Sequence, residues 1–143
     1  MKITVIMYHY VRELRFTKYP KIKALLASEF KEQVSYLQKY YEFVTITDCI
    51  DVVYNKSRAF PSNAALLTFD DGFIDHFTTV FPILEEREIQ GCFFPAAKTI
   101  EESTVLDVHK IQFILASLPN SSEIVDNIFK YLNHYKRNRA LTP

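Results

Sequence analysis

The sequence predicts an α/β protein in which the strands of a parallel sheet alternate with helices. Short apolar runs typical of strands alternate with apolar residues at helical spacing through most of the chain. The run of residues 64–69 is apolar at nearly every position, which is typical of a strand covered on both faces of a parallel sheet. The 143 residues can bury roughly 68% of the unfolded surface, which is enough for one domain.

The first half of the chain contains two predicted strands and two predicted helices. Residues 3–7 form the first strand and residues 43–46 form the second. A helix is expected to begin at Ser28, because apolar residues recur at helical spacing after it and its hydroxyl suits an N-cap. A shorter helix over residues 48–54 has Thr47 as its expected N-cap.

The second half continues the alternation for one more helix and one more strand. The buried strand at residues 64–69 is followed by a predicted helix over residues 75–86 and a predicted strand over residues 91–94. Pro82 lies inside this helix. It is expected to bend the helix, because it removes a backbone donor and crowds the preceding turn.

Two consecutive helices, at residues 108–118 and 123–135, then end the pattern without an intervening strand. They suggest a helical excursion before further strands. The sequence therefore predicts a single partial domain over residues 1–143, with a strand and helix part at residues 1–105 and a helical extension at residues 106–143.

Two adjacent carboxylates, Asp70 and Asp71, follow the buried strand and precede Gly72. In folds built from repeated strand and helix units, ligands and chemistry collect at the carboxyl ends of the strands. Successive strand residues point to opposite faces, so the two aspartates need a local bend to act at one site, and Gly72 allows it. The pattern indicates a metal-assisted hydrolytic site. An ordinary Asp-Gly turn is the alternative when the pair is taken alone.

Histidines supply the other candidate ligands. His9 ends the first strand and is predicted either to contact substrate and assist a metal, or to be a capped or core side chain. His76 follows Asp71 by five residues, where it could bind the same metal or cap the first turn of its helix. His109 and His134 lack acidic partners at useful spacing, so surface or packing roles are expected for both.

The stretch Thr68-Phe69-Asp70-Asp71-Gly72 matches the first motif of the polysaccharide deacetylases, carbohydrate esterase family 4. The sequence resembles that family over about residues 3–118, the N-terminal part of such a protein. A stretch at residues 106–116 resembles a branch of the family that is associated with bacterial surface-polysaccharide gene clusters. Three further stretches agree with the resemblance, at residues 7–11, 80–84 and 91–95.

The resemblance implies roles for individual residues and a partially complete irregular (β/α) barrel. Asp70 would be the general base that activates water, and Asp71 would be a ligand to a divalent metal, zinc above all. The implied reaction removes N-acetyl groups from amino sugars of a polysaccharide or its precursor. The expected sites around the two aspartates are a structural turn at Gly72, a further candidate metal ligand at His76, and substrate contacts at Tyr8, His9 and Phe73.

The sequence departs from the family pattern in its later motifs. It contains no His-Ser/Thr-x-x-His pair to complete the metal site, and it lacks the Arg-x-Pro loop and the Leu-x-x-His stretch. A (β/α) barrel normally needs more than ~200 residues. The chain is therefore expected to be a partial barrel, either a shortened gene product or one segment of a longer enzyme. Open strand edges favour a homodimer or a domain swap.

Composition limits the partners. The 17 basic and 17 acidic residues balance, which does not favour nucleic acid, and no apolar run is long enough to span a membrane. The apolar run after Lys2 is shorter than that of a signal peptide, so a cytoplasmic location is expected. Cys49 and Cys92 lie in apolar surroundings and are expected to be reduced, buried thiols.

Two alternatives come from other classes of protein. The first is a catalytically inactive glycan-binding or scaffold module of the same fold, which the missing histidine pair favours. The second is a phosphotransfer fold of the haloacid dehalogenase or receiver type, which also places acids at strand ends. Those folds use differently spaced acids and a later lysine, so the contiguous Thr-Phe-Asp-Asp-Gly argues against them.

Overall fold

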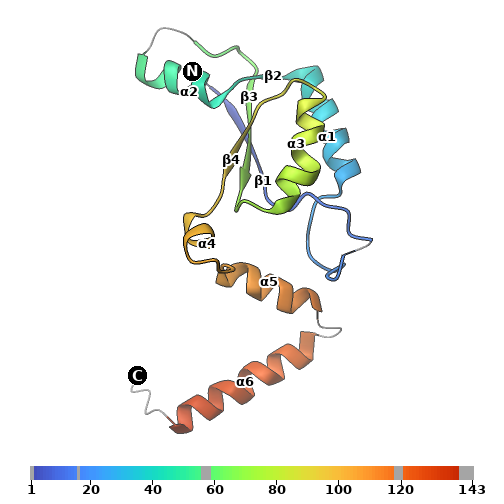
Figure 1. Ribbon diagram of the computed structural model, residues 1–143, viewed down its shortest axis with the longest axis vertical. Coiled ribbons are helices and arrows are strands. Elements are labelled where there is room, and N and C mark those ends of the chain that lie inside the picture. The colour runs from blue at the N-terminus through green and yellow to red at the C-terminus, as the bar shows by residue number, and fades with distance from the viewer. Residues whose placement is uncertain (1, 16, 56–58, 118–120, 139–143) are drawn as a thin grey trace. The chain divides into compact units, whose positions relative to one another are not determined.

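In the computed structural model, which describes residues 2–15, 17–55, 59–117 and 121–138, four parallel strands form one sheet (Figure 1). Strand β3 (Ala64–Asp70) lies in the centre and pairs with β1 (Thr4–Tyr8) along one side. Its other side is shared by β2 (Glu42–Phe43) at its start and β4 (Gly91–Phe94) at its end. The predicted α/β class is confirmed. The described sheet is open, so a closed barrel is not seen.

The chain divides into two compact units. The first, here called the sheet unit, comprises Met1–Leu14 and Lys23–Thr104, and the second, the helical unit, comprises Arg15–Ile22 and Val105–Pro143. The helices of the sheet unit are α1 (Ala27–Tyr40), α2 (Ile46–Ile50) with the π-helical turn η1 (Asp51–Asn55), the π-helical turn η2 (His76–Val80) with α3 (Phe81–Glu85), and α4 (Ala97–Glu101).

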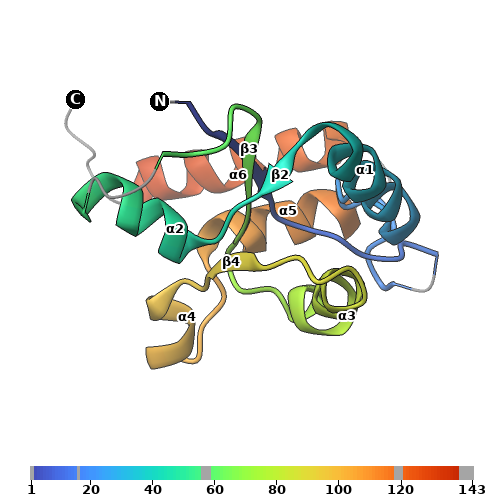
Figure 2. The same ribbon diagram turned by 90° about the horizontal axis from the view of Figure 1, so that it is seen from above.

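The core of the sheet unit lies between the sheet and the helices α1 and α3, which cover the same face (Figure 2). Phe30 and Val34 of α1 are fully buried against Leu67 and Phe69 of β3. Every residue from Ala64 to Phe69 is buried, as the continuous apolar run predicts, because both faces of β3 are covered. On the opposite face, Leu66 packs in a smaller cluster that includes both cysteines.

Two predicted helix caps are wrong. Ser28 lies inside α1. The N-cap is Leu26, whose backbone N–H donates to the Glu29 carboxylate at 2.9 Å. Thr47 lies inside α2, and the N-cap is Thr45, whose hydroxyl accepts a hydrogen bond from the Asp48 N–H at 3.1 Å. In both helices an acidic side chain in the first turn accepts a hydrogen bond from the backbone N–H of the N-cap residue. Each helix therefore begins earlier than the positions of Ser28 and Thr47 indicate.

Three other elements differ from their predicted form. Strand β2 is shorter than the expected 43–46, because Thr45 already caps α2. The helix expected over residues 75–86 consists of the π-helical turn η2 followed by α3, which begins at Phe81. Pro82 stands in the first turn of α3, where no backbone donor is needed. The short helix α4 was not predicted.

The helical unit contains the two predicted consecutive helices, α5 (Asp107–Ser117) and α6 (Ser121–Asn138). The rings of Tyr19 and Phe113 lie 4.7 Å apart and join the segment Arg15–Ile22 to α5. His109 is buried on α5. Within the described ranges, no helix combines the length and the apolar character that crossing a membrane requires.

Candidate active site

The parallel pairing of β1 and β3 brings His9 to the two aspartates. The last pair in register is Tyr8 with Phe69, so the next residues of both strands emerge at the same edge of the sheet. The Nε2 atom of His9 lies 3.8 Å from Oδ2 of Asp71. The His9 side chain is 46% exposed and that of Asp71 is 24% exposed, so both remain open to a small ligand.

The turn after β3 contains two successive residues with left-handed backbone conformations. Asp71 and Gly72 both have left-handed backbone conformations, with φ values of 75° and 65°. The Asp71 N–H donates to the carbonyl of Phe94 at 3.0 Å, which ties the turn to the end of β4. A Cβ atom on Gly72 would lie 2.7 Å from Cβ of Pro95. Only glycine therefore fits this turn without movement.

Asp70 is the last residue of β3, pairs in register with Phe94 and is half-buried. The thiol of Cys92 has a raised pKa, because it is desolvated by burial and because the Asp70 carboxylate opposes a second negative charge. Burial likewise raises the pKa of Cys49, with smaller contributions from Asp48 and Cys92. Both cysteines are free thiols, and burial of this kind keeps them protonated.

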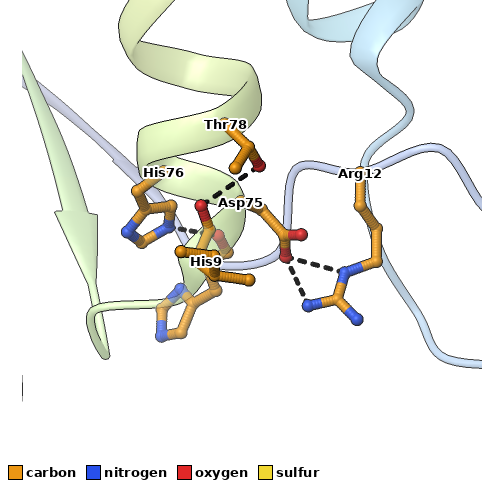
Figure 3. A network of polar contacts seen from close by, with 6 residues as sticks. His9, Arg12, Asp75, His76 and Thr78 are labelled. Atoms are coloured by element: carbon orange, nitrogen blue, oxygen red, sulfur yellow. Dashed lines mark hydrogen bonds and ion pairs between the residues drawn. The ribbon is translucent and has the colours of Figure 1, made fainter.

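His76 is buried close to the candidate site. Its Nε2–H donates to the main-chain carbonyl of His9 at 2.7 Å, as Figure 3 shows. The residue is 4% exposed, and its ring lies among the rings of Phe69, Phe73 and Phe93. Its Nδ1 is buried without a hydrogen-bond partner in the described part of the chain. One ring nitrogen is engaged and the other is enclosed, so this position does not support the ligand role considered for His76.

The two aromatic residues expected to contact substrate have different surroundings. Tyr8 is buried, its ring packs against Phe30 and Phe69, and its hydroxyl donates to Gln33 at 3.2 Å. It points into the core, because neighbouring strand residues face opposite ways and His9 takes the open side. Phe73 instead lines a pocket of about 280 Å³ beside the turn. The other lining residues are Gly72, His76, Phe77, Phe81, Phe93 and Pro95.

Sequence reasoning missed an ion pair beside the site. Arg12 and Asp75, 63 residues apart, are paired through their side chains, both of which are mostly buried. The guanidinium also lies 4.8 Å from the ring centre of Tyr10, which stacks on Phe73 at 4.0 Å. The available signal was that both residues follow strands predicted to be parallel. That signal does not specify which neighbours pair.

The donor types present suit part of a zinc site. Zinc binds imidazole nitrogen and carboxylate oxygen at ~2.0–2.2 Å, so donors of His9 and Asp71 that lie 3.8 Å apart can contact one ion. In the ranges that the structure describes, no group of three or more His, Cys, Asp or Glu side chains is placed to hold a metal. The described residues therefore fit two ligands of such an ion.

Comparisons with solved structures identify the fold. A de-N-acetylase from Aggregatibacter actinomycetemcomitans superposes with a TM-score of 0.59 and 23% identity, over 69% of this chain and 39% of that one. IcaB from Ammonifex degensii gives a TM-score of 0.57 and 31% identity, over 68% of this chain and 39% of that one. The Streptococcus pyogenes deacetylase PplD, solved in complex with acetate, gives 0.59 and 20% identity, over 78% and 50%.

No family model and no curated protein matches the sequence. The chain spans about two fifths to one half of the length of these three solved structures. In this chain the Thr68–Gly72 motif lies at the carboxyl end of β3, and its Asp71 lies beside His9. The chain therefore has the fold of these deacetylases, and its 31% identity with IcaB over 68% of its own length supports membership of the polysaccharide deacetylase family.

Proposed function

We propose that this chain carries the aspartates of a metal-dependent hydrolase that removes N-acetyl groups from the amino sugars of a polysaccharide or its precursor. The observation that carries the proposal is the placement of His9, Asp70 and Asp71 at one edge of a parallel sheet with a deacetylase fold. The de-N-acetylase and the deacetylase among the similar structures support the reaction type.

In this proposal Asp71 and His9 hold a divalent ion, with zinc suited to their donor types. The bound ion would supply Lewis acidity, which polarises the acetyl carbonyl and makes a nearby water more acidic. Asp70, on the neighbouring backbone position, accepts a proton from the attacking water. The C–N bond then breaks as its nitrogen takes up a proton, and the products are acetate and the free amino group of the sugar.

Phe73 is the described aromatic residue best placed for substrate, because it borders the turn and lines the adjoining pocket. Aromatic faces suit the apolar faces of sugar rings. Tyr8 has no part in this proposal, since its ring and hydroxyl are engaged in the core. In a longer chain of this family, the open sheet would form one part of an irregular (β/α) barrel whose other units would supply the remaining metal ligands.

The first test is calorimetric titration of zinc into the purified chain. We expect binding that is lost in Asp71→Asn and weakened in His9→Gln, because these variants remove a ligand each. His134→Gln is the matched control, since it makes the same change at a histidine that has no part in the proposed metal site. Equal affinity in all four proteins would contradict the assignment of the metal site.

The second test separates the base from the ligand in a chain long enough to include the family's histidine pair. Asp70→Asn should retain zinc and lower the rate of acetate release from an N-acetylglucosamine oligosaccharide by roughly 10²–10⁴-fold, the usual contribution of a general base. No acetate release from the unsubstituted long chain would contradict the proposed reaction. Retained glycan binding without release would favour the inactive binding module instead.

A further inference from the structure

Three contacts join the segment after β1 to the segment after β3. Arg12 pairs with Asp75, Tyr10 stacks on Phe73 at 4.0 Å, and the His76 Nε2–H donates to the His9 carbonyl at 2.7 Å. The ladder between the two strands ends at Tyr8 and Phe69, so no strand hydrogen bonds hold these segments together beyond that point. Side chains therefore supply the connection where the candidate site lies.

The geometry and burial of the Arg12–Asp75 pair restrict the movement of both side chains. Nε of Arg12 donates to Oδ2 of Asp75 at 2.8 Å, and Nη2 donates to the same oxygen, as the dashed lines in Figure 3 show. The side chains are only 15% and 14% exposed, so solvent screens the pair less than a surface pair. Two charge-assisted donors from one planar group restrict orientation in a way that a lysine ammonium does not.

The segment that carries Arg12 is itself anchored. The Arg12 N–H donates to the carbonyl of Leu25, and the Leu25 N–H donates to the carbonyl of Tyr10, both at 3.0 Å. On the other side, the His76 N–H donates to the carbonyl of Phe73 at 2.9 Å. Each partner of the ion pair thus stands on an ordered backbone, and His9 is the residue between the end of β1 and this anchored segment.

We propose that Arg12 and Asp75 are positioning residues that hold the His9 imidazole against the Asp71 carboxylate. Neither touches the reacting groups in this assignment. Their pairing fixes the distance between the two segments, and with it the 3.8 Å separation of Nε2 of His9 from Oδ2 of Asp71. The inference deepens the proposed function, since a metal held by His9 and Asp71 would depend on this separation.

A magnetic resonance experiment tests the positioning without requiring metal or activity. In protein labelled with ¹³C-histidine, the His9 imidazole signal is assigned by its absence in His9→Gln, and its shift on Asp71→Asn is recorded at fixed pH. We expect the change in the His9 chemical shift that Asp71→Asn causes to be at most half as large in protein that also carries Arg12→Lys or Asp75→Asn. The matched control background is Glu102→Gln, which removes the exposed pair that Lys98 and Glu102 form at 3.9 Å.

An undiminished shift in the Arg12→Lys and Asp75→Asn backgrounds would overturn the inference. Arg12→Lys keeps the charge, so it provides a result even if Asp75→Asn fails to fold. Zinc affinity should fall about tenfold in both variants, as is usual for a residue that orients a ligand. Unchanged affinity would overturn the link to the metal. If the unsubstituted chain binds no zinc, the proposed function fails while the resonance experiment still decides the positioning.

Discussion

At the scale of single residues, the candidate site depends on a turn that permits little variation. Two successive left-handed residues, Asp71 and Gly72, follow a strand that is otherwise regular. An aspartate tolerates that conformation better than most side chains, and glycine adopts it freely. The turn allows the side chain of Asp71 to reach His9, which follows the neighbouring strand β1.

Gly72→Ala should destabilise the sheet unit by about 2–4 kcal/mol, because it adds left-handed strain to a collision with Pro95. Gly91→Ala is the matched comparison. Its new Cβ would meet side-chain atoms of Leu84, Phe69 and Phe93 and no backbone atom among its nearest contacts, so a smaller loss of ~1–3 kcal/mol is expected. Urea unfolding followed by circular dichroism measures both. A larger loss for Gly91→Ala would contradict the strain argument.

At the scale of elements, the helices are positioned by local capping as well as by burial. Helix α2 begins where Thr45 and Asp48 satisfy each other's backbone groups: the Thr45 N–H donates to the Asp48 carboxylate at 2.8 Å, and the Asp48 N–H donates to the Thr45 hydroxyl. This reciprocal pair ends β2 and turns the chain onto the face of the sheet where both cysteines pack. The start of α2 thus also defines the end of β2.

Thr45→Ala should therefore lower the free energy of unfolding by about 1 kcal/mol, the usual cost of losing an N-cap side chain. Thr47→Ala, a change of the same chemistry inside the first turn of α2, should alter stability by less than about 0.5 kcal/mol. The urea unfolding midpoints of the two variants, compared with that of the unsubstituted protein, measure both losses. Equal losses would mean that the hydroxyl of Thr45 contributes no cap.

At the scale of the whole molecule, the described sheet has open sides. Strand β1 pairs only with β3 in the described residues, and its Val5 and Met7 side chains are 56% and 60% exposed. Apolar strands at an open sheet edge favour association with another strand. In a longer chain the further units of the proposed barrel would cover these edges.

The chain on its own should consequently associate. Light scattering is expected to give about twice the 16.8 kDa mass of one chain, and Val5→Lys on β1 should return it to one mass, because charge at an edge opposes strand pairing. Tyr54→Lys is the control, since this exposed aromatic residue lies in η1 and outside the sheet. A single-chain mass for the unsubstituted protein at all concentrations would refute the expected dimer.

The sequence by itself determined the features that depend on local pattern: the α/β class, the fully buried strand β3, the position of Asp70 and Asp71 at its carboxyl end, and the two consecutive final helices. Apolar periodicity reports these directly, because it reflects which faces of an element are covered. The cap positions were predicted less well. Two hydroxyl residues, Thr45 and Thr47, stand near the start of α2, and the N-cap of α1 is Leu26, which has no hydroxyl group to mark it.

Only the tertiary structure decided which side chains meet. Strand alternation shows that Tyr8 and His9 face opposite ways, and only the packing of α1 and α3 shows that Tyr8 enters the core while His9 faces Asp71. Arg12 and Asp75 carry no local signal of pairing, because they are 63 residues apart. They meet because β1 and β3, distant in sequence, lie side by side and parallel in the sheet. The segments that follow the two strands therefore begin at the same edge.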